Sequence, residues 1–324
     1  SMIYQENTVV TVVENDNEAI YHCNILDFLK GYMDNYEIWN YTEIPFMGGA
    51  VGAIGYDIAM QYKNISNTTA HGLNIPIAHF LFITEFIAYD HDHGKILLVA
   101  IDTDDAIGKC RAENQLKKME KSLEKPVESS SPLQASTPKK EENLTSNMTK
   151  EAFIHKVISA KKYIEQKDIS QVVISKRWKA THDIHPFQLY RNLRFLNPSP
   201  YLFYFNFGAY QIVGSSPEML VEIKNEKIYT CPIAGTRKRG KTLEQDAELE
   251  KELLSDPKEV KEHIMLVELS KQDMEQVSCK ENIDVKDYMQ IQKFSHVMHI
   301  TSLVTGKKKE NISPIDVIQS FLPA

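Results

Sequence analysis

The chain has 324 residues, 42% of them hydrophobic and 25% charged, a composition typical of a globular protein with a sizeable core. Its net charge is −7, and its basic residues are spread along the chain, without the patch or stripe typical of nucleic-acid-binding domains. No apolar run reaches the roughly 20 residues of a membrane span, and no signal peptide is visible. We therefore expect a cytoplasmic protein with no nucleic-acid partner and no membrane association.

The four cysteines predict no structural role of their own. Cys23, Cys110, Cys231 and Cys279 lie far apart, with no CxxC pair and no metal-ligand spacing. We interpret them as free, buried thiols in a reducing compartment.

The first part of the sequence, residues 1–124, predicts strands and turns followed by a helix. A β-branched run at residues 8–13 is typical of a strand. Residues 46–57 carry glycines among apolar residues without the GxGxxG spacing, so they predict bends and close backbone approach rather than a phosphate loop. The further elements expected here are a hairpin formed by residues 80–89 and 95–102 and a polar helix over residues 104–124.

Residues 125–148 differ in composition from the segments on either side. They are Ser, Pro, Lys, Glu and Asn with few large apolar side chains. Such a segment cannot bury enough apolar surface to order itself, so we expect a polar linker or mobile loop. The sequence thus divides into an N-terminal region, residues 1–124, this linker, and a second region, residues 149–324.

The second region mixes helical signals with short apolar runs. Thr149 can cap a helix, and Ser313-Pro314 predicts the start of another. The remaining expected elements are a buried strand at 171–175, a helix from Pro186, strands at 201–207, 210–214, 219–224, 227–232 and 297–305, a turn at Asn225-Glu226, and a long helix after Ser255. Hairpins combined with separate helices indicate an α+β fold.

Two glutamates on the long helix are candidate metal ligands. Glu259 and Glu262 are three residues apart, so they share one helix face. Two inward-facing carboxylates repel unless a cation lies between them, and Mg²⁺ prefers such oxygen ligands. The alternative is a solvated face, because Lys258 and Lys261 alternate with the glutamates, and the spacing by itself favours that alternative.

Three further positions are candidates for a binding or catalytic role. Glu218 follows Pro217 and could act as a general acid in an apolar pocket, or simply be an exposed turn residue. Gly235 would let a ligand carboxylate approach the main chain beside Thr236. His299 would line a pocket only if its strand faces one, and a lone strand histidine is usually structural. We interpret residues 237–239 as partly a solvated basic turn.

Several ordered blocks of the sequence together resemble the chorismate-utilising enzymes, and most closely anthranilate synthase component I. The resemblance extends from about Ile44 to the C-terminus. The blocks are residues 45–57, 171–177, 197–204, 214–218, 232–240, 256–269 and 295–300, among them Pro232-Ile233-Ala234-Gly235-Thr236 and Asp256-Pro257-Lys258-Glu259. The resemblance implies an α+β fold of two packed, mostly antiparallel β-sheets with helices on the outside, with residues 149–324 as an incomplete chorismate-binding catalytic domain.

The resemblance also implies a role for each candidate residue. Glu262, supported by Glu259, would bind Mg²⁺, which would hold the ring carboxylate of chorismate. Glu218 would protonate the departing C4 hydroxyl, and His299 would assist that departure or the later elimination of pyruvate. The substrate site would be lined by Ala234, Gly235 and Thr236.

Two positions bear on which nucleophile the family resemblance implies. Relatives that use water carry a lysine where Gln171 stands, and aminodeoxychorismate synthases often carry one where Ala234 stands. The expected reaction is therefore addition of ammonia at C2 to give anthranilate and pyruvate, the first step of tryptophan biosynthesis. The ammonia would come from a glutamine amidotransferase, component II. The stretch Pro200, Tyr201 and Leu202 resembles the family's tryptophan feedback site.

The sequence also departs from the family pattern. It ends at Ala324 where the family continues with further site residues, and Glu268 to Met274 differ from the usual DLGRNDL. We therefore expect this chain by itself to be inactive. The alternatives are aminodeoxychorismate synthase component I, of the folate pathway, and an inactive fragment that only binds tryptophan or the amidotransferase.

Overall fold

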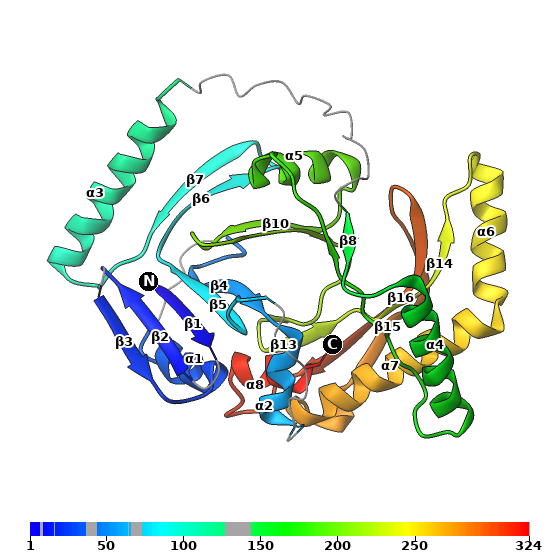
Figure 1. Ribbon diagram of the computed structural model, residues 1–324. Coiled ribbons are helices and arrows are strands. Elements are labelled where there is room, and N and C mark those ends of the chain that lie inside the picture. The colour runs from blue at the N-terminus through cyan, green and yellow to red at the C-terminus, as the bar shows by residue number, and fades with distance from the viewer. Residues whose placement is uncertain are drawn as a thin grey trace. The chain divides into compact units, whose positions relative to one another are not determined.

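The computed structural model describes residues 1–6, 9–15, 17–36, 44–63, 65, 73–126 and 144–323. It divides into two compact units, one formed by Ser1–Pro126 and Leu196–Ala324 and the other by Val127–Phe195 (Figure 1). The division of the sequence into separate regions at residues 1–124 and 149–324 remains a prediction. Most of the predicted linker, residues 127–143, lies outside the described residues.

The first unit begins with a five-stranded antiparallel sheet of order β3-β2-β1-β5-β4, followed by a two-stranded ladder, β6-β7. Its strands are β1 (Met2–Glu6), β2 (Val9–Glu14), β3 (Asn17–Tyr21), β4 (Gly49–Ile54), β5 (Ala78–Ile83), β6 (Glu85–Asp90) and β7 (Lys95–Ala100). Its helices are α1 (Ile25–Met33), the short η1 (Tyr56–Ile58), α2 (Ala59–Tyr62) and α3 (Ala106–Leu123). The predicted hairpin and polar helix are confirmed, although the strand expected at 80–89 divides at Thr84 between two sheets.

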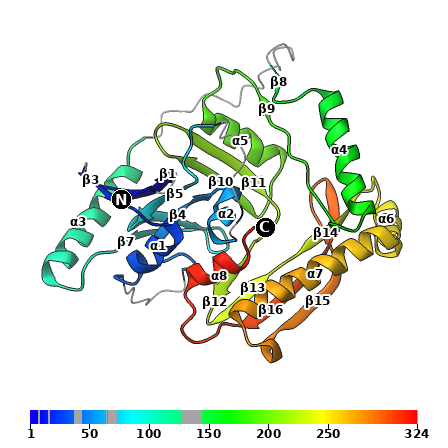
Figure 2. The ribbon, with the colours of Figure 1, turned by 60° about the horizontal axis from the view of Figure 1, so that its bottom comes forward.

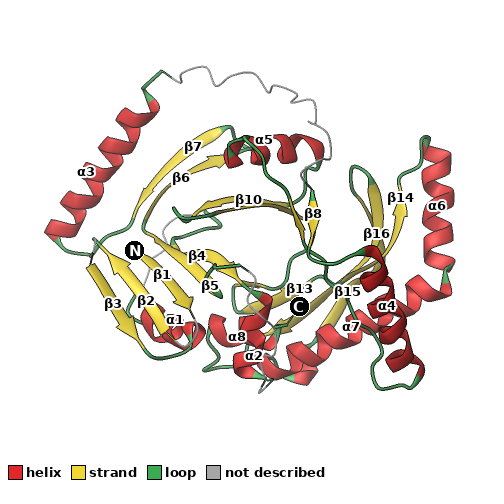
Figure 3. Ribbon diagram, in the orientation of Figure 1, coloured by secondary structure: helices red, strands yellow, loops and turns green. Residues whose placement is uncertain are grey.

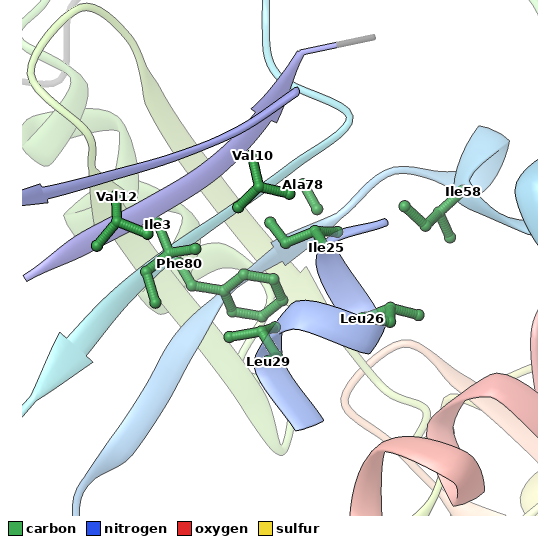
Figure 4. Packing of buried hydrophobic residues seen from close by; sticks show 9 residues of the cluster. All are labelled: Ile3, Val10, Val12, Ile25, Leu26, Leu29, Ile58, Ala78 and Phe80. Carbon is green, nitrogen blue, oxygen red and sulfur yellow. The ribbon is translucent and has the colours of Figure 1, made fainter. Parts of the chain in front are cut away.

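Helix α1 covers this sheet and closes its hydrophobic core (Figure 4). Ile25, Leu26 and Leu29 are at most 1% exposed, so one stripe of the helix is buried against the strands. Asn24, the N-cap residue, makes no side-chain cap hydrogen bond. Instead the buried Gln5 of β1 accepts a hydrogen bond from the Ile25 amide at 2.9 Å, so the sheet itself satisfies a helix-end donor.

The glycine-rich segment supplies strand β4, as its composition predicted. A Cβ at Gly52 would collide with the carbonyl oxygen of His79 on β5, so a side chain there would force the two strands apart. The close backbone approach expected from the spaced glycines is therefore confirmed at this position.

The rest of the first unit holds a second five-stranded antiparallel sheet, built around one long strand. Strand β16 pairs with β13 and then β14 along one edge and with β15 along the other. The strands are β10 (Tyr201–Asn206), β11 (Gln211–Ser216), β12 (Glu222–Lys224), β13 (Lys227–Thr230), β14 (Ile233–Lys238), β15 (Asp284–Lys293) and β16 (Val297–Lys307), of which β10 and β11 form a separate hairpin. The helices are α6 (Leu243–Ser255), α7 (Pro257–Val277), the short η3 (Lys280–Asn282) and α8 (Pro314–Ser320).

Helix α7 lies along this second sheet (Figure 2). Val267, Met274 and Val277 are buried and pack with Ile228 and Val304 of the strands, which form a core distinct from that of the first sheet. The predicted start of this helix, the Ser313 cap of α8 and the Asn225-Glu226 turn are all confirmed, the last with both residues at positive φ.

The second unit contains α4 (Lys150–Glu165), the short strand pair β8 (Thr145–Ser146) and β9 (Trp178–Lys179), and most of α5 (Pro186–Leu196). Thr149 caps α4 as predicted, its hydroxyl accepting from the Ala152 amide at 3.2 Å. The buried strand predicted at 171–175 is wrong, because no strand is assigned there and Val173 is 86% exposed. A β-branched run does not form a strand unless a partner strand lies alongside it.

The α+β fold class is confirmed by this combination of antiparallel sheets and separate helices (Figure 3). Within the described ranges, no helix is both long enough and apolar enough to cross a membrane.

A buried histidine joins the first sheet to the β10-β11 hairpin. His79 on β5 is 5% exposed, and its Nδ1 lies 2.8 Å from the hydroxyl of Tyr210. Its ring stacks on Phe207, with 4.0 Å between ring centroids. Burial lowers the pKa of His79 to about 4, so the ring is neutral at pH 7.

We expect His79 to make the fold sensitive to acid. Because the folded-state pKa, about 4, lies below the ordinary value near 6.5, protonation favours unfolding as the pH falls from 6.5 toward 4. The loss should approach about 3 kcal/mol near pH 4. Urea unfolding across this range should show a flatter pH dependence for His79→Phe than for the parent. A parallel change at the exposed His22 should leave the slope unaltered, and equal slopes for all three proteins would contradict the assignment.

Candidate active site

The candidate site is built on a bulge in the second sheet. Ala234 pairs with Ile300 but Thr236 pairs with His299, so Gly235 is the one extra residue in β14. Gly235 has a φ of +79°, a conformation that side chains other than glycine rarely adopt. Thr236 and His299 are thereby placed opposite each other.

Gly235 also allows α7 to lie close to β14. A Cβ at this position would stand 3.1 Å from Ile300 Cδ1, 3.2 Å from Leu253 Cδ1 and 3.3 Å from the Cβ of Glu259. Glycine therefore gives the strand and the glutamate-bearing helix turn room to pack together. Ala234, beside it, is 6% exposed.

The hydrogen bonds of His299 determine which ring nitrogen carries the proton. Its Nδ1 lies 3.1 Å from the Gly235 carbonyl oxygen and 3.0 Å from Thr236 Oγ1. Since a carbonyl oxygen can only accept, Nδ1 carries the proton and donates it. In the neutral ring Nε2 then holds the lone pair, which suits a group that accepts a proton and later returns it.

Glu218 lies close to this histidine, in the loop that follows β11. Its Oε1 accepts a hydrogen bond from the Ile233 amide at 3.3 Å. Although part of the residue is exposed, burial of the carboxyl raises its pKa, an effect that the Ile233 hydrogen bond and the positive charge of His299 partly offset. A carboxyl with a raised pKa that lies beside a histidine has the properties of a general acid.

Glu259 and Glu262 lie in the first turns of α7. Asp256 caps the helix by accepting hydrogen bonds from the amides of Lys258 and Glu259. The side chain of Glu259 is 15% exposed whereas that of Lys258 is 80% exposed, so the lysine faces solvent and Glu259 faces the sheet. Glu262, one turn further on, is half-buried. The first glutamate therefore does not belong to a solvated face.

These two carboxylates fit a magnesium ion that is completed by its substrate and water. Within the described ranges, no group of three or more His, Cys, Asp or Glu residues stands together as a closed metal site. Mg²⁺ usually binds through one or two carboxylates and takes its other oxygens from substrate and solvent. The turn of α7 that carries Glu259 packs directly on the bulge, because the Glu259 Cβ lies 3.3 Å from where a Cβ at Gly235 would stand.

The basic segment after Thr236 is not a solvated turn, contrary to our interpretation of the sequence. Residues 237 and 238 belong to β14, and only Lys238 points to solvent. Arg239 donates to Asp246 from Nε and Nη2, the latter at 2.6 Å, and to the Phe294 carbonyl from Nη1. Asp246 is 3% exposed, and Arg239 lowers its pKa. Asp246 lies on α6, a helix that the sequence did not predict, and Phe294 follows β15.

Arg237 is likewise held by carboxylates. Its Nε donates to Glu252 at 2.8 Å and its Nη2 to Asp256 at 2.7 Å, while Nη1 donates to the Thr236 carbonyl at 2.9 Å. The alternation of arginine with Lys238 along a strand was the signal that could have indicated one buried, paired face.

A second interaction that the sequence did not reveal fixes α7 to the sheet. Nε2 of the fully buried His263 lies 2.7 Å from Ser302 Oγ on β16. That oxygen also accepts from the Met289 amide at 2.9 Å, in an irregular stretch of β15 where Asp287 and Met289 have positive φ. Burial lowers the pKa of His263, so a neutral ring anchors the helix beside Glu262.

The residues expected to form an effector site begin strand β10. Pro200 precedes the strand, and Tyr201 pairs with Ser216 of β11. Tyr201 is 44% exposed, and its pKa is raised first by burial and then by the charges of Glu222 and Cys231. Tyr201 and Leu202 therefore lie on the hairpin whose other strand leads to Glu218. A tryptophan site here stays a prediction.

The comparisons with known proteins agree with this arrangement. The profile of the chorismate binding enzyme family matches residues 4–324, and the chain belongs to that family. The chain is similar to anthranilate synthase component 1 of Acetivibrio thermocellus, with 40% identity over 99% of this chain. It is also similar to the component 1 of Aquifex aeolicus, with 38% identity over 86% of this chain. It covers 66% and 57% of those relatives.

A solved structure supports the same conclusion. The fold is similar to the crystal structure of anthranilate synthase component I from Streptococcus pneumoniae, with a TM-score of 0.84 and 31% identity. The match covers 100% of this chain and 72% of that one. The implied family membership and architecture are thus confirmed.

We expect Glu218 to titrate above the ordinary glutamate value of 4.5 because of its burial. Carboxyl ¹³C NMR, with the Glu218 signal assigned by its loss in Glu218→Gln, should show this midpoint directly. His299→Gln should raise the midpoint further, because a positive charge that favours the carboxylate is removed. His296→Gln, an exposed neighbour, is the control. A midpoint at or below 4.5 in the parent would refute the general-acid assignment.

Proposed function

We propose that the protein is the chorismate-using component of an anthranilate synthase, which converts chorismate and ammonia to anthranilate and pyruvate. The observation that carries the proposal is the convergence of Glu218, Thr236 and His299 with the Glu259 helix turn at the β14-β16 bulge. The 40% identity to a component 1 enzyme over nearly the whole chain supports it.

The proposed chemistry begins with an acid-assisted displacement. Ammonia adds at C2 of the ring while the double bonds shift and the C4 hydroxyl departs. Glu218, whose pKa is raised by burial of its carboxyl, would give that hydroxyl its proton so that it leaves as water. His299, with its lone pair on Nε2, would take the extra proton of the new ammonium group at C2 and pass it to the Glu218 carboxylate, which restores both groups for the second step. The Glu218 carboxylate formed in this step would be stabilised by the imidazolium.

The second part of the reaction is loss of pyruvate. The C2 proton is removed, the ring becomes aromatic, and the bond from C3 to the enolpyruvyl oxygen breaks. His299 is the group we assign to this proton transfer, held in one orientation by the Gly235 carbonyl and Thr236. The enolpyruvate released takes up a proton to become pyruvate.

Glu259 and Glu262 would hold Mg²⁺ next to the ring carboxylate of chorismate. The chemistry that the ion supplies when bound is neutralisation of that carboxylate, which draws charge from the ring. The backbone at Gly235 and the Thr236 hydroxyl would line the substrate pocket. We also propose a glutamine amidotransferase as the ammonia donor and tryptophan as an effector at Pro200 to Leu202, in keeping with the component 1 relatives.

We expect the native-length protein, given chorismate, Mg²⁺ and ammonium, to form anthranilate and pyruvate in equal amounts. Glu218→Gln should lower turnover at least about 100-fold, because the acid is lost while its shape is kept. Glu262→Gln should also abolish turnover. Glu248→Gln, on the exposed face of α6, is the matched control and should retain the parent's rate. Chromatography with fluorescence detection resolves the products.

The other outcomes identify the alternatives. Aminodeoxychorismate without pyruvate would mean the folate-pathway enzyme, and tryptophan binding without turnover would indicate a binding module. The 324-residue chain is assayed in parallel to test whether it is inactive by itself.

A further inference from the structure

Arg237 connects the substrate-side strand to the helix that carries the two glutamates. Its side chain is 20% exposed, and its guanidinium reaches the last turn of α6 at Glu252 and the first residue before α7 at Asp256. The remaining guanidinium nitrogen, Nη1, donates a hydrogen bond to the Thr236 carbonyl. One planar group thus links strand β14 to the end of α6 and to the start of α7.

The bond to Asp256 acts on the helix end itself. Oδ2 of Asp256 accepts a hydrogen bond from Arg237 Nη2, and Oδ1 accepts from the amides of Lys258 and Glu259, at 2.9 and 3.4 Å. One carboxylate oxygen of Asp256 therefore caps the helix and the other binds the arginine. Arg237 thus orients the capping residue of the turn that carries Glu259. A cap with a free side chain could rotate, and the first turn would then lose its fixed position against β14.

Arg237 does not form a hydrogen bond with the Glu259 carboxylate. Nη1 lies 3.8 Å from Glu259 Oε1, beyond hydrogen-bonding distance, while Nη1 donates to the Thr236 carbonyl at 2.9 Å. The Glu259 carboxylate is therefore not hydrogen-bonded to the arginine, and its Oε1 lies 3.4 Å from Nζ of Lys258, whose side chain is 80% exposed.

We propose that Arg237 is a positioning residue for the cation site, holding the first turn of α7 so that Glu259 and Glu262 can bind Mg²⁺ together. This inference rests on the proposed function, because it assigns the two glutamates to the cation. The role depends on geometry and not on charge alone. A lysine has no planar fork and cannot bridge Glu252, Asp256 and a carbonyl at once.

The test measures Mn²⁺ binding to the native-length protein by electron paramagnetic resonance, with Mg²⁺ as the competitor. Arg237→Lys keeps the charge and loses the fork, so we expect cation affinity to fall about 10- to 100-fold, the range typical when a group that orients metal ligands is removed. Lys238→Gln, the exposed basic neighbour on the same strand, is the matched control and should bind as the parent does.

A second variant keeps the test decisive if Arg237→Lys folds poorly. Glu252 is 59% exposed and lies on a helix, so Glu252→Ala should fold, and it removes the acceptor of one arm of the guanidinium. We expect a smaller loss of affinity in the same direction, with an unchanged melting temperature. In turnover assays both variants should raise the Mg²⁺ concentration needed for half-maximal rate more than they lower the rate at saturating Mg²⁺.

The outcomes separate this inference from the proposed function. If Glu259→Gln and Glu262→Gln leave Mn²⁺ binding intact, the glutamates are not the cation site and the function as proposed fails. If those variants lose binding but Arg237→Lys binds as tightly as the parent, only the positioning role is overturned. Tighter binding in Arg237→Gln would also overturn it, because the arginine would then be a competitor of the cation.

Discussion

The candidate site depends on a single extra residue in strand β14. In a regular antiparallel ladder one residue faces one partner, and a shift by one residue moves side chains to the opposite face of the sheet. The insertion of Gly235 between Ala234 and Thr236 makes that shift locally. Thr236 therefore meets His299, and the next residue, Arg237, turns toward the helices. A side chain at Gly235 would both strain the backbone and press on Glu259.

The charges around this strand are already largely paired with one another. The chain carries a net charge of −7, so an anionic substrate needs local positive charge to bind. Arg237 and Arg239, the nearest guanidinium groups on the strand, are both paired with carboxylates of α6 and the α6-α7 junction. They stabilise the architecture and are not available to an anion. A divalent ion on Glu259 and Glu262 would supply the charge that the arginines do not.

The parts of this structure that could be predicted from sequence are those encoded within a few residues. The caps at Thr149 and Ser313 and the turn at Asn225-Glu226 each depend on neighbours that a sequence displays. The buried strand expected at 171–175 failed because a strand also requires a partner, which no local pattern specifies. The family resemblance identified Glu218 and His299, and their individual environments would not have done so.

The contacts that hold the site together join residues far apart in sequence, and that is why they were missed. His263 and Ser302 are 39 residues apart, and Arg237 and Asp256 are 19 apart. A buried serine hydroxyl and a strand arginine have many possible partners in a chain of this length. The packing of α7 against β14 and β16 determines which partner each of these side chains has. It places His263 beside Ser302 and Asp256 beside Arg237, where buried polar groups need a hydrogen-bond partner.

The first sheet also supports Glu218, through its contacts with the β10-β11 hairpin. His79 of β5 contacts Phe207 and Tyr210 at the turn of the β10-β11 hairpin, and β11 ends at Ser216, two residues before Glu218. Glu218 is thus supported from both sides, by this hairpin and by the Ile233 amide of the second sheet. Because the hairpin also begins with Tyr201, any ligand bound at that end would act on the same strands that position the acid. The hairpin therefore joins the Tyr201 end of these strands to the Glu218 carboxyl through continuous backbone.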